Sequence, residues 1–300
     1  MDMRVNIAGV EWKNPVTVAS GTFGSGEEFS DFVDLNKLGA VTTKGVAHVP
    51  WSGNPTPRVA EVYGGMMNAI GLQNPGIDLF CERDIPFLKK YDTKIIVNVC
   101  GHAPEEYLAV VERLADEPID MMEINISCPN VNAGFLAFGQ DAGHVEKLTA
   151  QIKKIAKQPV IMKLTPNVTD ITEIAKAAEA GGADAISLIN TLTGMKIDIN
   201  RKTFALANKT GGVSGPIVHP IAVRMVYQAA QAVKIPIIGM GGIQSAEDAI
   251  EFLLAGASAV SVGTANFYHP NITEEVVDGI RAYMEKNGFD KVSDMVGIVK

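Results

Sequence analysis

The chain has 300 residues and a formal net charge of −8 at pH 7. Its lysines and arginines form no cluster of the kind that displaces counterions from a phosphate backbone, so the composition argues against a nucleic-acid partner. No apolar run approaches the roughly 18 residues of a membrane span, and the initial MDMRVNIAG lacks the apolar core of a signal peptide, so we expect a soluble, cytoplasmic protein.

Eight short apolar runs follow one another along the chain, after a hairpin signal at Val5 to Trp12. Such runs, bounded by polar or turn residues, are typical of strands that are covered on both faces. They are Val16 to Ala19, Val41 to Thr43, Ile95 to Val99, Met121 to Ile126, Val160 to Leu164, Ala185 to Ile189, Ile237 to Met240 and Ala259 to Val262.

The segments between these runs carry helix signals, such as Asp170 before ITEIAKAAEAGG and Ser245 before another amphipathic stretch. Eight strand-helix units in a row predict an α/β fold, a TIM (β/α)8 barrel in a single domain of residues 1–300. An open doubly wound sheet is the alternative. The long connections Val46 to Ile77 and Asn190 to Val218 predict functional loops after the second and sixth strands.

In such a barrel the working face lies at the carboxyl ends of the strands. In this sequence these ends carry amides, hydroxyls, two lysines, one thiol and glycine pairs. They are Ser20, Lys44, Asn98, Asn125 with Ser127 and Cys128, Lys163, Asn190 with Thr191, Gly241 with Gly242, and Gly263 with Thr264. Each alone is as well explained by an ordinary polar loop, but the whole set predicts a binding or catalytic site.

The last two strand ends, Gly241-Gly242 and Gly263-Thr264, occupy the place where barrels commonly bind phosphate through backbone N–H groups. Glycine permits close approach of the backbone, so these pairs predict a phosphate-bearing ligand. The alternative is that the glycines serve only as tight turns.

Lys163 and Lys44 each end an apolar run, where a lysine is partly desolvated. Two such cations suit one anionic small substrate and one cofactor that becomes negative when it is reduced. A pair of core salt bridges is the alternative.

The three cysteines, Cys81, Cys100 and Cys128, are odd in number and widely spaced, so they predict neither a disulfide framework nor a zinc site. The five histidines form no HxxxH or HExxH pattern, so we expect no protein-bound metal. Cys81 and Cys100 are expected to be buried, whereas the polar neighbours of Cys128 favour a reactive thiol.

Several motifs together resemble the class 1, B-type dihydroorotate dehydrogenase catalytic subunits, over essentially the whole chain. They are ASGTFG at Ala19 to Gly24, TTKG at Thr42 to Gly45, MNAIGLQNPG at Met67 to Gly76, INISCPN at Ile124 to Asn130, NTLTGMKID at Asn190 to Asp198, LANKTGGVSGP at Leu206 to Pro216, GMGGI at Gly239 to Ile243 and VGTANF at Val262 to Phe267. SCPN and GLQNPG are the most specific of them. The resemblance implies an FMN-bearing barrel that oxidises dihydroorotate to orotate in pyrimidine biosynthesis.

The same resemblance implies a role for individual residues. FMN would be contacted by Ser20, Lys44, Gly45, Asn98, Asn125, Lys163, Ile189, Gly215, Gly241, Gly242, Gly263 and Thr264. The substrate would be held by Lys44, Asn68, Ala69, Ile70, Gly71, Leu72, Asn125, Asn190 and Thr191. Cys128 would be the base that takes the C5 proton while hydride leaves C6. Lys44 would meet the substrate carboxylate, and Lys163 would stabilise the reduced flavin.

The electron acceptor follows from the resemblance as well. The chain has no strand-bound GxGxxG fingerprint, and its three scattered cysteines are too few for an iron-sulfur cluster. B-type relatives pass electrons to a partner subunit that carries FAD and a 2Fe-2S centre and reduces NAD, so we expect such a partner in a heterotetramer of two of each subunit. The alternatives are an A-type homodimer that reduces fumarate, a reductase of free pyrimidines and a non-redox barrel that binds a phosphorylated metabolite.

Overall fold

Eight parallel strands form the centre of this computed structural model, which describes residues 1–126 and 138–299. Their order in the sheet is β3-β16-β15-β10-β9-β8-β7-β4. The bounds are β3 (Val16–Val18), β4 (Ala40–Thr42), β7 (Lys94–Val99), β8 (Met121–Asn125), β9 (Val160–Lys163), β10 (Ala185–Leu188), β15 (Ile237–Met240) and β16 (Ala259–Val262). The outermost two strands meet, since the hydroxyl oxygens of Thr17 and Thr42 are 3.1 Å apart. The sheet is a nearly closed barrel, so the predicted TIM fold is confirmed and the open sheet is excluded.

The apolar runs of the sequence form these strands because both of their faces are covered. β9, β10, β15 and β16 are buried at every position, and their apolar side chains belong to one large core, except that of Met240, which lines the cavity at the end of β15. Buried polar side chains interrupt this apolar interior, among them Asn98, Glu123 and Lys163 on three neighbouring strands. Burial of polar groups is unfavourable unless they find partners, so these three mark a part of the barrel with more than a packing role.

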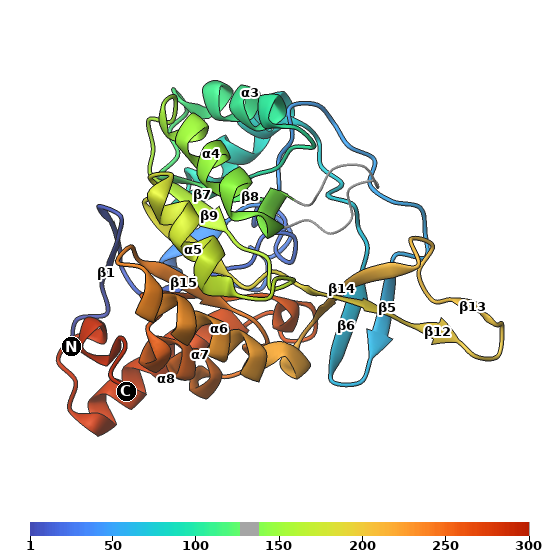
Figure 1. Cartoon of the computed structure of the whole chain (residues 1–300). Helices are drawn as coiled ribbons and strands as arrows, with labels where there is room; N and C mark the ends of the chain where they lie inside the picture. Colours follow the sequence, from blue (N-terminus) through green and yellow to red (C-terminus); the bar gives the residue numbers. More distant parts are fainter. Residues whose placement is uncertain (127–137, 300) are drawn as a thin grey trace.

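Helices cover the outside of the barrel (Figure 1). The α-helices are α1 (Ile77–Leu79), α2 (Ile85–Leu88), α3 (Pro104–Leu114), α4 (Ala142–Lys153), α5 (Ile171–Ala180), α6 (His219–Ala232), α7 (Ala246–Ala255) and α8 (Ile272–Asn287). A π-helical turn, η2 (Phe80–Asp84), joins α1 to α2. Short 3-10 turns are η1 (Leu35–Lys37), η3 (Phe138–Gln140), η4 (Pro216–Val218), η5 (Thr264–Phe267) and η6 (Val292–Met295). In the described part of the chain, none of the helices has the length and apolarity needed to cross a membrane.

The predicted helix starts are confirmed, but the first strand-helix unit departs from the prediction. Asp170 caps α5 by accepting the Thr172 N–H, and Ser245 forms a capping box at the start of α7. Between β3 and β4, however, the helical element is only the short turn η1. The reason is local, because three glycines from Gly21 to Gly26 have positive φ and cannot extend a helix.

The two long connections pair with each other, which the sequence did not predict. They contribute β5 (Val59–Val62), β6 (Gly65–Asn68), β11 (Leu192–Met195) and β14 (Thr210–Ser214) to a sheet of order β11-β14-β6-β5. A further hairpin, β12 (Ile197–Asp198) with β13 (Thr203–Phe204), extends away from the barrel (Figure 1). This small sheet carries Asn68 to the mouth of the barrel.

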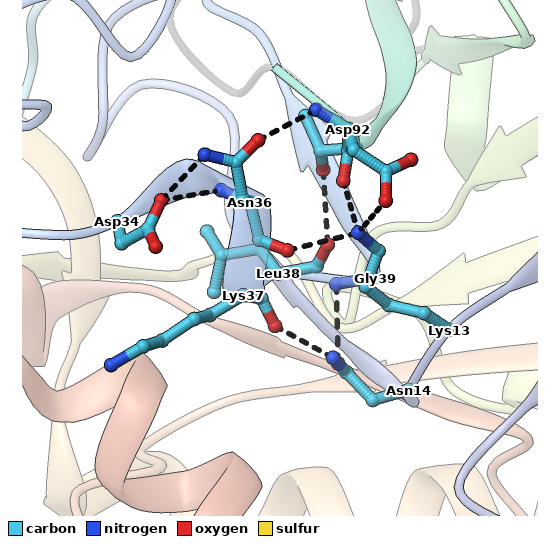
Figure 2. A network of polar contacts seen from close by, with 9 residues as sticks. Lys13, Asn14, Asp34, Asn36, Lys37, Leu38, Gly39 and Asp92 are labelled. Carbon is cyan, nitrogen blue, oxygen red and sulfur yellow. Dashed lines mark hydrogen bonds and ion pairs between the residues drawn. The ribbon is translucent and has the colours of Figure 1, made fainter.

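The opposite end of the barrel is held by a polar network at the amino ends of β3, β4 and β7 (Figure 2). Asn14, just before β3, donates to the Lys37 carbonyl at 2.7 Å and accepts the Gly39 N–H at 3.1 Å. Lys13 forms an ion pair of 2.5 Å with Asp92, which precedes β7. The predicted N-terminal hairpin, β1 (Val5–Ile7) with β2 (Val10–Trp12), is confirmed at the start of the chain. Contacts at this end stabilise the barrel and stay clear of its carboxyl end.

Candidate active site

A cavity of about 410 Å³ opens at the carboxyl ends of the barrel strands. Most of the residues that the sequence predicts as contacts line it. They are Ser20, Lys44, Gly45, Asn68, Ile70, Gly71, Leu72, Asn125, Lys163, Ile189, Asn190, Thr191, Gly215, Gly241, Gly242, Gly263 and Thr264. Barrel closure therefore brings residues from Ser20 to Thr264 into one site.

Three predicted residues do not belong to this lining. Asn98 is fully buried behind the cavity, and its Oδ1 accepts a hydrogen bond from Asn125 Nδ2 at 3.4 Å. Ala69 is buried in a small apolar cluster with Leu206, so its side chain faces away from the cavity lining. Cys128 lies outside the described residues.

The glycine turn after β15 has a backbone that larger residues would not allow. Gly241 has a φ of +139°, and a Cβ there would lie 2.5 Å from the Cβ of Ala222. Gly242 has a φ of +72°, and its added Cβ would lie 2.8 Å from the Gly215 carbonyl oxygen. Nδ1 of His219 donates to the Gly241 carbonyl at 2.9 Å and holds the turn in place. Such a turn lets a ligand approach the backbone closely, as a phosphate site requires.

Lys163 reaches the cavity from inside the barrel. Its side chain is only 4% exposed, its Nζ donates to the hydroxyl of Ser20 at 3.1 Å, and it lies 3.6 Å from Oε2 of Glu123. Of the pair of core salt bridges that the sequence left as an alternative, the one at Lys163 is present, and the same lysine also lines the cavity. Lys44 is half-buried on the cavity wall. Two cations thus face one small volume, which favours an anionic ligand.

Three asparagines supply amide groups to the cavity wall, namely Asn68, Asn125 and Asn190. The hydroxyl of Tyr107 donates to the backbone carbonyl of Asn125 at 2.9 Å and fixes the end of β8. Oδ1 of Asn190 accepts the N–H of Thr191 at 2.9 Å. Each amide offers both a donor and an acceptor, so this wall suits a small ring with alternating N–H and C=O groups.

The structure adds lining residues that the sequence did not single out. The small sheet contributes Val59, Met66, Val213 and Ser214, and the Thr264 hydroxyl donates to Ser214 Oγ at 2.8 Å. The remaining additions are Ala19, Gly21, Thr22, Val218, Met240, Ser261 and Phe267. Val213 and Ser214 lie within the LANKTGGVSGP motif, which was the available signal for them, whereas Val59 and Met66 lie in none of the motifs.

The cysteines and acidic groups give no sign of a metal centre in residues 1–126 and 138–299, where no three His, Cys, Asp or Glu side chains form a candidate metal site. Cys81 and Cys100 are buried, as the sequence predicts. Burial raises the pKa of the Cys81 thiol to about 11, so this thiol is protonated and unreactive at neutral pH.

Comparison with known proteins identifies the family. A family model described as dihydroorotate dehydrogenase matches residues 2–284. The chain is 68% identical over 300 residues to a protein of Lachnoclostridium phytofermentans, with both chains covered completely. It is 61% identical to a protein of Alkaliphilus metalliredigens, covering 99% of this chain and 98% of the relative, and 51% identical to one of Thermoanaerobacter pseudethanolicus, covering 100% and 99%. All three relatives are named dihydroorotate dehydrogenase B (NAD(+)), catalytic subunit. The chain belongs to the dihydroorotate dehydrogenase family.

Proposed function

We propose that this chain oxidises (S)-dihydroorotate to orotate in de novo pyrimidine biosynthesis, as the FMN-binding catalytic subunit of a B-type dihydroorotate dehydrogenase. One observation carries the proposal: Lys44, Lys163 and three asparagines line the same cavity as the Gly241-Gly242 turn. The names of the relatives describe the same enzyme. The proposal treats residues 1–300 as one FMN-binding domain that acts in the cytoplasm.

The residues of the cavity fit an FMN molecule. The positive-φ turn at Gly241-Gly242, together with Gly263-Thr264, would hold the phosphate, since a Cβ on Gly242 would collide with the backbone. Lys163 would contribute a cation beside the ring system. We propose further contacts from Ser20, Lys44, Gly45, Asn125, Ile189 and Gly215. Asn98 lies behind Asn125, so its role would be to hold that amide in place. When bound, FMN supplies the acceptor for the substrate hydride.

The substrate would lie against the asparagine wall. Lys44 would bind its carboxylate, and the amides of Asn68, Asn125 and Asn190 would pair with the ring edge. The further proposed contacts are Ile70, Gly71, Leu72 and Thr191, whereas the side chain of Ala69 belongs to the small apolar cluster. Cys128 is proposed as the base, because a thiolate with a pKa near the working pH can take the C5 proton while hydride leaves C6.

The electrons would leave through a second protein. The relatives are named catalytic subunits, which supports a separate partner subunit for this chain. We propose that the partner carries FAD and a 2Fe-2S centre, reduces NAD, and assembles with this chain as a heterotetramer of two of each subunit.

The proposal is tested by identifying the cofactor that the purified chain releases and by assaying dihydroorotate oxidation with and without the partner subunit. FMN absorbance and partner-dependent NAD reduction are expected. Turnover with fumarate by the isolated chain would assign it to the A-type instead. Activity on free pyrimidines that lack the carboxylate would indicate a pyrimidine reductase. If the purified chain contains no flavin and binds none when FMN is added, the non-redox barrel is the remaining alternative.

Replacing Lys44 by methionine is expected to weaken orotate binding about 10- to 100-fold, since a charge-assisted hydrogen bond contributes roughly 1.5–3 kcal/mol. The affinity for uracil, which lacks the carboxylate, should fall much less. Calorimetric titration of both ligands measures the difference. Lys37→Met is the matched control, because Lys37 pairs with Glu274 through a bond of 2.6 Å and is absent from the cavity lining. Equal losses for both ligands would remove Lys44 from the carboxylate role.

A further inference from the structure

Glu123 is a carboxylate at the centre of β8, inside the barrel, and it is only 2% exposed. Ser187 on β10 donates to its Oε1 at 2.7 Å, and Asn98 on β7 donates to its Oε2 at 2.5 Å. The same Oε2 lies 3.6 Å from Nζ of Lys163 on β9. Four strands therefore converge on this one side chain, directly behind the cation that lines the cavity.

The two charges are interdependent because both side chains are almost completely buried. The side chains of Lys163 and Glu123 are 4% and 3% exposed. A buried charge that loses its partner keeps its desolvation penalty, whereas a neutral pair of similar shape avoids it. Ser187 and Asn98 satisfy the carboxylate on its other sides, so its geometry is fixed from three directions.

The position of Glu123 also affects the electrostatic field that a ligand in the cavity experiences. A bare lysine beside the cavity would present a full positive charge in a poorly screened environment. With the carboxylate 3.6 Å behind it, much of this field is cancelled. Lys163 keeps a partial positive field, and its Nζ, which contacts Ser20, can still interact with a ligand.

We propose that Glu123 is a positioning residue for Lys163, which it holds toward the cavity while moderating the positive field that the bound flavin experiences. The inference rests on the proposed FMN function and deepens it. It predicts that the pair, and not the lysine alone, sets how much more tightly the reduced flavin is bound than the oxidised one. Glu123 itself acts through Lys163 and contributes no proton to the reaction.

The first experiment uses the flavin-free full chain and a double-mutant cycle of Glu123→Gln, Lys163→Met and the two changes combined. Each single variant should unfold more readily than the wild-type chain. The unfolding constant of the combined variant should be at least about tenfold smaller than the value expected if the two single effects were additive. Additive effects would overturn the pairing. This result is independent of flavin, so it separates the inference from the proposed function, which fails if the wild-type chain binds no FMN.

The second experiment measures the affinity of each variant for oxidised and reduced FMN. Glu123→Gln should raise the preference for reduced FMN about tenfold, equivalent to about 30 mV for a two-electron couple. Lys163→Met should lower the preference, and the combined variant should return it toward wild type. Opposite signs of this kind do not arise from a purely structural contact. An unchanged or lowered preference in Glu123→Gln would refute the inference.

Thr17→Val is the matched control, since Thr17 is another buried polar residue of the barrel and its hydroxyl lies 3.1 Å from that of Thr42. It should lose stability with no change in flavin preference. If Glu123→Gln does not fold, Glu123→Asp takes its place, because the shorter side chain moves the carboxylate away from Nζ of Lys163. A shift toward reduced FMN in that variant supports the inference, and no shift overturns it.

Discussion

Replacing Cys128 by serine is expected to slow the reduction of bound flavin by dihydroorotate about 100-fold or more at neutral pH, with FMN still bound. A general base contributes typically 10² to 10⁴ in rate, and a hydroxyl gives up its proton far less readily than a thiol. Stopped-flow absorbance of the flavin under anaerobic conditions measures the reduction step directly. The defect should shrink as the pH rises, because hydroxide then assists proton removal.

Cys81→Ser is the matched control for this experiment. Cys81 is buried and its raised pKa of about 11 keeps it protonated, so the same change there should leave the reduction rate within about twofold. A Cys128→Ser variant with a wild-type reduction rate would remove this residue from the role of base. Loss of flavin in that variant would instead assign Cys128 to cofactor binding.

Replacing Gly242 by alanine is expected to weaken FMN binding about 100-fold, since a hydrogen bond to a charged group such as phosphate contributes roughly 1.5–3 kcal/mol. The added Cβ would lie 2.8 Å from the Gly215 carbonyl oxygen, 2.8 Å from the Cβ of His219 and 3.1 Å from its backbone nitrogen. These atoms belong to the backbone or lie next to it, so the turn itself must move. Fluorescence titration of the flavin-free chain with FMN measures the loss.

Gly288→Ala separates this effect from backbone strain. Gly288 ends α8 with a φ of +74°, close to the +72° of Gly242, and its added Cβ would meet no atom within 4 Å. Both variants should lose about 1–2 kcal/mol of stability from the left-handed backbone, measured by thermal or denaturant unfolding. Only Gly242→Ala should lose FMN affinity. Equal affinity in the two variants would contradict a phosphate site at this turn.

The sequence predicted the barrel well because its signals are local. A parallel strand that is covered on both faces needs a continuous apolar run, and all eight such runs form barrel strands. The strand ends also supplied most residues of the cavity, since the carboxyl ends of barrel strands and the loops that follow them are where a barrel places its binding groups. The apolar segment containing Glu123, by contrast, gave no hint that its single carboxylate would have partners.

The amino-acid sequence by itself determined the strands, the helix caps and the residue types at the mouth of the barrel, because burial, capping and positive φ act over a few neighbouring residues. Tertiary structure alone decided three things. It set the depth of Asn98 behind Asn125, the pairing of β6 with β14, and the convergence of Ser187 and Lys163 on Glu123. These contacts join residues that are distant in the chain, so they exist only once the strands have closed around a common interior.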